Sequence, residues 1–431
     1  MKKRIFALLT ALAMLVGLFA ACRGDIAEPI PAPSPPAESP SPVIPSEEEE
    51  PDVDIHEDIT PWLLSAEAQG AILDFSHELF YAVLTLEDEN PLFSPLSAYY
   101  ALAMTALGAR GETALEFFGV LGLDPMELAQ ELRSLTASLI DTGGNTALNI
   151  AGGVWTDEDF EIHPEFAALL AEYFNAPAKS LDFEDPATVQ EINAWVAEQT
   201  HGLIEDLLSS IGRDAVMLLI NTLYFSAQWA EPFHPMTSFN GLFRLADDTE
   251  VETSFLSTRA VSLPVSVTDQ YEAVSLPYDD ERLGFLLVRP TDGTDIRAFA
   301  ADFHLSETLA SLASRDSVRV RMPKLDLTFD FLLNDLLQNM GLVEAFGDDA
   351  DFSGLTAMDE TLRISRVLQK VRLLVDEEGT EAAAATAIEM EVTSINLEQL
   401  DLVFDTAYLY VIYDVLLGIP LFMGILENPV V

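Results

Sequence analysis

The segment DEEGTEAAAATAIEMEVTS at residues 376–394 constrains the fold more than any other stretch of this chain. Its alanine-rich middle has a high intrinsic helix propensity. Read with a period of two, it divides into an uncharged face and a face that carries every charge from residue 380 onward. The uncharged face is Thr380, Ala382, Ala384, Thr386, Ile388, Met390 and Val392, and the charges are Glu381, Glu389 and Glu391. This alternation is typical of a strand with one buried face. A segment that can be a helix or a loop is therefore also patterned as a core strand.

The N-terminus has the pattern of a secretory signal. The basic residues MKKR precede an apolar run from Ile5 to Ala21, which ends in small residues. A basic start, a short apolar core and small residues at a cleavage site are typical of a signal peptide. We therefore expect residues 1–21 to be a signal peptide and the protein to be exported.

Cys22 is the only cysteine in the chain and follows this signal directly. LFAAC resembles the bacterial lipobox, in which a lipid is attached to the cysteine and the chain is cleaved before it. An exported protein with one cysteine has no internal disulfide, which favours lipid attachment over an ordinary cleaved signal that leaves a free thiol. We expect the protein to be held on the outer side of a bacterial membrane by this lipid alone.

Composition then divides the rest of the chain. Residues 22–60 are rich in Pro, Ser and Glu, and such a segment cannot bury enough apolar surface to fold. We expect a disordered, semi-extended tether there. Residues 61–431 have a globular composition with no second linker and no repeat, which predicts one large domain.

The net charge limits the partners of this domain. The formal charge is −51, from 72 acidic and 21 basic residues. This excess argues against binding nucleic acid through a basic patch and favours solubility and cationic partners. Because it is spread over the whole chain, we read it first as a solvated acidic surface.

Hydrophobic patterns predict helices early and strands late. Helices are expected after Ser94-Pro95, after GARGET, from Pro164, and in a segment that ends near Gly202. AVMLLINTLYFSAQWAEPF at residues 215–233 predicts a strand buried on both faces. A strand pair is expected around the turn at Gly418. The mixture indicates an α+β fold rather than a regular βαβ series.

Six blocks of the globular part resemble the serpin family and follow one another in that family's order. The blocks are FSPLSAYYALAMTALGARGET from Phe93, NTLYFSAQWAEPF from Asn221, VRMPKLDLTF from Val320, LQNMGLVEAFGDDADFSGL from Leu337, VDEEGTEAAAATA from Val375 and IPLFMGILENP from Ile419. The resemblance runs from about Ala66 to Pro429. It implies the serpin fold, a large domain with several sheets, a helical cluster and an exposed reactive-centre loop at about residues 377–403. In that family the loop inserts into the central sheet after a protease cleaves it, which explains the double pattern of residues 376–394.

The resemblance implies inhibition of a serine protease by a suicide mechanism rather than an enzymatic activity. The protease attacks the loop and forms its acyl-enzyme, and loop insertion then distorts the protease before deacylation. The expected hinge of the loop is Glu377, Glu378, Gly379, Thr380, Glu381, Ala382, Ala383, Ala384, Ala385 and Thr386. Its small inward side chains can enter a packed sheet without overpacking it, whereas charges on that face would be costly to desolvate.

The family's spacing, counted from Glu377, places the scissile bond between Thr393 and Ser394. The segment that follows is longer than in the commonest members, so Val392 and Met390 remain alternatives. None of these residues is basic, which disfavours a trypsin-like target and favours elastase-like or subtilisin-like proteases. A non-inhibitory serpin and a cysteine protease inhibitor remain the competing interpretations.

Five further residues match the family's sheet-opening region. Ser94, Ser97 and Asn221 match polar positions beneath the central sheet, and Gln369 stands where the family usually has a histidine; Trp229 matches the top of the sheet. Glutamine donates and accepts hydrogen bonds but does not titrate near neutral pH.

Other functions find little support in the sequence. It has no HExxH, GxSxG, phosphate-loop or dinucleotide motif, so we expect no enzyme activity, no metal and no cofactor. Residues 125–141 hold one basic residue, Arg133, where polysaccharide-activated family members carry basic clusters. We therefore expect a monomer that binds its target protease but no sulfated polysaccharide.

Overall fold

The computed structural model describes residues 64–86, 89–140, 145–291, 293–356, 362–380 and 399–430. The chain divides into two compact units, Met1–Glu57 and Asp58–Val431, and every described residue belongs to the second. No helix in the described ranges is long and apolar enough to cross a membrane. The expected signal peptide, the tether and Cys22 lie outside the described residues.

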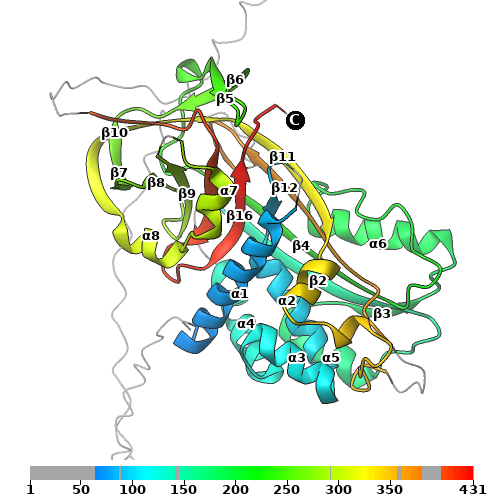
Figure 1. The fold of residues 1–431 in the computed structure, drawn as a ribbon. Helices are drawn as coiled ribbons and strands as arrows, with labels where there is room; N and C mark the ends of the chain where they lie inside the picture. Colours follow the sequence, from blue (N-terminus) through cyan, green and yellow to red (C-terminus); the bar gives the residue numbers. More distant parts are fainter. Residues whose placement is uncertain are drawn as a thin grey trace, which may run out of the picture. The chain divides into compact units, whose positions relative to one another are not determined.

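Two sheets contain the strands of the described residues (Figure 1). The order in the ten-stranded sheet is β1 (Leu92–Phe93), β16 (Pro420–Leu426), β15 (Tyr408–Asp414), β9 (Leu283–Pro290), β8 (Tyr271–Pro277), β7 (Val261–Val267), β10 (Ala313–Pro323), β6 (Glu250–Ser257) and β5 (Phe239–Arg244), with β14 (Leu400–Val403) beside β10. The order in the six-stranded sheet is β11 (Leu325–Leu332), β12 (Arg366–Val375), β13 (Gly379–Thr380), β4 (Met217–Gln228), β2 (Ala147–Asp157) and β3 (Ala178–Leu181).

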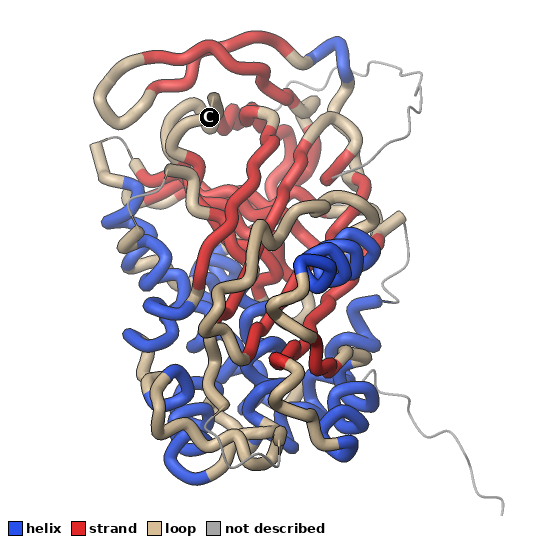
Figure 2. Tube along the Cα trace, turned by 90° about the vertical axis from the view of Figure 1, so that its right-hand side faces the viewer, coloured by secondary structure: helices blue, strands red, loops and turns tan. Residues whose placement is uncertain are grey.

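Most helices gather toward one end of the strands (Figure 2). The helices are α1 (Ala66–Leu84), α2 (Pro95–Ala106), α3 (Gly111–Leu121), α4 (Pro125–Ile140), α5 (Pro164–Phe174), α6 (Pro186–Gln199), α7 (Ile296–Ala301), α8 (Leu305–Ser311) and α9 (Asn334–Asn339). The predicted α+β class is confirmed by this arrangement.

Helix α2 lies at the centre of the helical cluster. Ser94 caps it by accepting the backbone N–H of Ser97 at 3.2 Å, and Pro95 occupies its first turn, where no N–H is needed. Every residue of α2 is buried, so the helix has no solvent-facing side. It therefore presents Ser94 and Ser97 to the sheet from within the core.

The six-stranded sheet is covered on both faces. On one face, α2 contacts β2 and β4. On the other, Ile192 and Val196 of α6 belong to an apolar cluster with Trp155 of β2 and Ile220 of β4. Since both faces are covered, the first seven residues of β4 are all buried, as the apolar run at residues 215–233 predicts.

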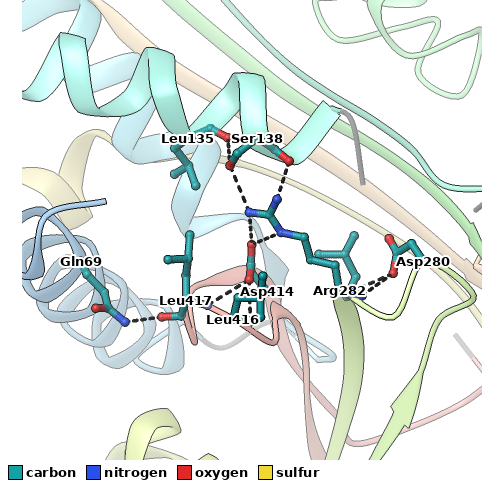
Figure 3. A network of polar contacts seen from close by, with 9 residues as sticks. Gln69, Leu135, Ser138, Asp280, Arg282, Asp414, Leu416 and Leu417 are labelled. Carbon is teal, nitrogen blue, oxygen red and sulfur yellow. Dashed lines mark hydrogen bonds and ion pairs between the residues drawn. The ribbon is translucent and has the colours of Figure 1, made fainter. Parts of the chain in front are cut away.

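A buried ion pair joins three segments beside the ten-stranded sheet (Figure 3). Arg282 donates from Nε to Asp414 Oδ2 at 2.9 Å, and its Nη2 lies 2.7 Å from the same oxygen. Arg282 also donates to the carbonyl and hydroxyl of Ser138 in α4. Asp414 accepts the backbone N–H of Leu417 in the turn between β15 and β16. The Asp414 side chain is 1% exposed and that of Arg282 is 16% exposed, so the pair ties α4 to the connection between β8 and β9 and to the end of β15 largely away from water.

The predicted elements agree with the structure in type. The helices after Ser94-Pro95 and from Pro164 are present, and the helix expected to end near Gly202 ends at Gln199. Strands β15 and β16 flank a turn in which Gly418 has φ +64°, a backbone conformation that favours glycine.

Candidate functional site: the opening between β4 and β12

The two central strands of the six-stranded sheet separate along their length. β4 and β12 are parallel and pair directly from Arg366↔Leu218 to Gln369↔Asn221. Further along, β13 lies between them, with Thr380 opposite both Ala227 of β4 and Val375 of β12. Between these levels, no described residue in 222–226 of β4 pairs with 370–374 of β12. The sheet therefore has an opening that is closed at one end by direct pairing and at the other by β13.

Gln369 forms the centre of a polar cluster at the closed end. Its Nε2 lies 2.9 Å from Ser94 O, 3.1 Å from Ser97 Oγ and 3.0 Å from Asn221 Oδ1. Its Oε1 accepts the backbone N–H of Ser94 at 3.0 Å, and Ser97 Oγ donates to Asn221 Oδ1 at 2.6 Å. All four residues are buried, so the free-energy cost of leaving any of these polar groups unpaired is high. The structure thus brings together the four residues that the sequence placed beneath the sheet.

Trp229 lies at the other end of the opening, apart from this cluster. Its Nε1 donates to Asp376 O at 3.0 Å, and its backbone N–H donates to Glu378 O at 3.0 Å. Its ring stacks on Tyr278 with centroids 4.7 Å apart and planes at 8°. Trp229 therefore holds the turn that leads into β13.

Tyr278 is a residue of this site that sequence reasoning missed. Its hydroxyl lies 2.6 Å from Thr380 Oγ1, and both side chains are buried. Burial raises the pKa of Tyr278, so the phenol remains a hydrogen-bond donor at every physiological pH. In the sequence, LPYDD is the polar end of an apolar strand, and nothing in that pattern indicates contact with a segment about a hundred residues away.

An ion pair fixes the start of the hinge. Glu377 Oε2 lies 2.7 Å from Lys324 Nζ, and its Oε1 accepts from Ser238 Oγ at 2.7 Å. Burial alone would raise the pKa of Glu377, but the hydrogen bonds from Lys324 and Ser238 outweigh it and hold this pKa below its usual range. The Glu377 carbonyl also accepts the backbone N–H of Phe233 at 2.8 Å. Lys324 and Ser238 were not expected as site residues.

Gly379 is required by close packing rather than by backbone freedom. A Cβ at this position would lie 2.0 Å from Ala227 O and 2.8 Å from Gln228 Cα. No side chain fits at such distances, because the obstructing atoms belong to the backbone of β4. Gly379 therefore has a steric role at the start of the expected hinge, since it lets the chain approach β4 closely.

Both ends of the predicted loop lie within the described residues. Residues 377–380 are anchored in the sheet, and Leu400–Val403 forms β14, which pairs in parallel with β10. Within the range expected for the loop, Gly379 and Thr380 at one end and Leu400–Val403 at the other therefore take part in strand pairing. The remaining predicted hinge and scissile-bond residues lie outside the described residues: Glu381, Ala382, Ala383, Ala384, Ala385, Thr386, Met390, Val392, Thr393 and Ser394.

The arrangement suits strand addition. Within the described residues, no group of three or more His, Cys, Asp or Glu side chains could hold a metal ion. The opening instead presents two facing strand edges, whose backbone groups can pair with an incoming extended segment. The first two residues of such a segment, Gly379 and Thr380, are already in place.

Comparisons with known proteins agree with this geometry. The family described as Serpin (serine protease inhibitor) matches residues 70–429. An uncharacterised serpin-like protein of Thermococcus kodakarensis is 33% identical over 371 residues, which cover 84% of this chain and 85% of the relative. Among solved structures, the thermophilic serpin tengpin in its native state matches with a TM-score of 0.79 at 27% identity, covering 85% of this chain and 95% of its own. Human thyroxine-binding globulin matches with a TM-score of 0.76 at 26% identity, covering 84% and 98%.

Proposed function

Because this chain belongs to the serpin family, we propose that it inhibits serine proteases as a suicide substrate. The observation that carries the proposal is β13, which occupies the first positions of a new strand between β4 and β12 in the uncleaved chain. The protein is then a substrate-like inhibitor and not an enzyme. The target protease cleaves the loop and forms the acyl-enzyme, and insertion of the loop into the sheet holds the protease in that form.

The register of β13 predicts where an inserted loop would lie. β13 is antiparallel to both of its neighbours, so each further loop residue lies opposite a residue one place earlier in β4 and in β12. Thr380 is opposite Ala227 and Val375 and has its side chain buried. Every second residue after Thr380 would then point into the core as well.

The uncharged face of the loop matches this register. Its residues would fall opposite buried side chains, in the order Ala382 with Phe225 and Leu373, Ala384 with Leu223 and Val371, and Thr386 with Asn221 and Gln369. Ala383 would instead lie opposite Tyr224 and Arg372, which are partly exposed. Ala382 and Ala384 would thus pack against the apolar core, and Thr386 would lie at the polar cluster. The cluster has to open before Thr386 can insert.

Inhibition depends on the relative rates of two reactions of one acyl-enzyme. Hydrolysis would release an active protease and a cleaved inhibitor. Insertion would move the acylated protease away with the loop and distort it before hydrolysis. Added strand hydrogen bonds and burial of the loop's apolar face provide the free energy for insertion.

We further propose that the target has a preference for small or aliphatic residues, as elastase-like and subtilisin-like proteases do. The candidate residues before the scissile bond, Thr393, Val392 and Met390, are all uncharged. Export, a lipid on Cys22 and residues 22–60 as a tether would place the inhibitor outside a bacterial membrane. The support for this placement is the N-terminal sequence pattern.

Two point variants test insertion directly. In Ala384→Glu, the carboxylate would have to be buried between Leu223 and Val371, so cleavage in the loop should no longer raise the melting temperature. Ala383→Glu is the matched control, because the same charge would point outward and insertion should still stabilise the cleaved protein. Equal stabilisation of both cleaved variants would refute the register.

A protein that binds without inhibiting is the second candidate function. Human thyroxine-binding globulin shares the fold, so the fold alone does not establish inhibition. Cleavage of the wild-type loop without any rise in melting temperature would favour this second candidate, and a third outcome, trapping of cysteine proteases only, would redirect the target class.

A further inference from the structure

The hydroxyl pair between Tyr278 and Thr380 lies where the sheet opening meets β13. The Tyr278 side chain is 0% exposed and that of Thr380 is 1% exposed, so water cannot replace either partner. The Tyr278 ring stacks on Trp229 and meets Phe225 edge-on, with centroids 5.2 Å apart at 79°. These contacts fix the ring on two sides, so its hydroxyl points at Thr380 without having to be ordered first.

The same bond would exist before and after loop insertion. Thr380 already has its final register against Ala227 and Val375, and insertion continues from this rung rather than moving it. The bond is broken only when the hinge leaves the sheet. It therefore stabilises the resting and inserted states equally and destabilises only a state with an expelled hinge.

We propose that Tyr278 is a positioning residue that locks Thr380 as the first rung of the inserted strand before any protease binds. The lock has two opposite effects, and these rest on the proposed inhibitory function. It provides a nucleus for insertion, so insertion becomes faster relative to hydrolysis of the acyl-enzyme. It also withdraws Gly379 and Thr380 from the loop, which leaves less chain for docking to the protease.

Hydrogen exchange of the hinge tests the lock without any protease. Tyr278→Phe and Thr380→Val each remove one hydroxyl and keep the shape, and each should speed exchange in a peptide spanning residues 376–382 about five- to tenfold. The double variant should exchange no faster than either single variant, because the two hydroxyls form one bond. Thr380→Ser keeps the hydroxyl and should restore the slow exchange.

A second tyrosine provides the matched control. Tyr413 lies in the same ten-stranded sheet as the strand preceding Tyr278, and its buried hydroxyl lies 2.9 Å from Ser275 Oγ, away from the hinge. Tyr413→Phe should lower overall stability to a similar extent and leave hinge exchange unchanged. If Tyr278→Phe and Thr380→Val leave hinge exchange unchanged, or if Tyr413→Phe accelerates it equally, the lock is refuted.

Inhibition kinetics then test the two effects on function. Against a protease that the wild type traps, Tyr278→Phe should raise the association rate constant a few-fold and also raise the number of inhibitor molecules consumed for each protease trapped. A variant that was only destabilised would not change both in this direction. If the wild type traps no protease, the proposed inhibitory function is refuted. The hydrogen-exchange experiment still shows whether the bond between Tyr278 and Thr380 holds the hinge in the sheet.

Discussion

The polar cluster of Ser94, Ser97, Asn221 and Gln369 closes one end of the opening, and we call it the gate because it has to open for further insertion. Its strongest test is Gln369→Leu. Leucine has a similar size and keeps the apolar contacts, but it removes the amide that serves Ser94, Ser97 and Asn221. At about 1 kcal/mol for each net hydrogen bond, with some acceptors left unpaired, we expect the free energy of unfolding to fall by about 2–4 kcal/mol. A shift of the urea midpoint at constant slope would measure this change.

The effect on the gate is separable from this loss of stability. The bond from Gln369 to Asn221 connects β12 to β4 and has to break when the strands part, whereas the bonds to Ser94 do not cross the opening. Losing about 1 kcal/mol from the barrier corresponds to about a fivefold faster insertion. Cleaving the loop with a non-target protease and following the change of Trp229 fluorescence with time would measure the insertion rate.

A matched control comes from another buried amide. Asn193 of α6 donates to Leu208 O at 2.7 Å and accepts the backbone N–H groups of Leu207 and Leu208. Among the described residues, its side chain has no hydrogen bond to β4 or β12. Asn193→Leu should lower stability without faster insertion. Equal insertion rates in the wild type and in Gln369→Leu, despite a lower stability of the variant, would refute the gate.

Three further predictions concern single charges and hydrogen bonds. Gln369→His should introduce an acid dependence of insertion, because a protonated imidazole cannot accept the Ser94 N–H; an unchanged pH profile would contradict this. The pKa of Glu377 is lowered in the folded protein, so its ion pair with Lys324 is intact above the ordinary carboxylate pKa and is lost as the pH falls through the lower folded value. Hydrogen exchange of the hinge should therefore accelerate below about pH 4. Glu377→Gln should abolish this pH dependence. Asp414→Asn should lower the free energy of unfolding by about 3 kcal/mol in urea, because it leaves the Arg282 charge buried beside a neutral amide; a change below about 1 kcal/mol would show that the pair is unimportant.

Local signals were sufficient to predict the elements that frame the site. Ser94-Pro95 specifies the start of α2 through a side-chain cap and a proline in the first turn, and the long apolar run of β4 specifies a strand covered on both faces. The resemblance to one family then placed Ser97, Asn221 and Gln369 together, although they are far apart in the chain. Those positions could be predicted because each lies inside a block that matches the family.

The contacts of the hinge could not be predicted in this way. Tyr278 directly follows β8, and Lys324 lies between β10 and β11. Their contacts with the hinge depend on how those strands are placed in the sheets, which composition does not contain. β13 has two residues, too few for a period of two to be recognised. The requirement for Gly379 likewise comes from the backbone of β4 and not from its own neighbours in sequence.

We propose above all that this serpin traps a protease covalently by inserting its loop. The most direct measurement is to mix the protein with elastase-like, chymotrypsin-like, subtilisin-like and trypsin-like serine proteases, and to analyse the products by denaturing gel electrophoresis and mass spectrometry. We expect a complex that resists denaturant with an elastase-like or subtilisin-like protease, and a released peptide that begins at Ser394. Cleavage of the loop by every protease without a covalent complex would contradict it.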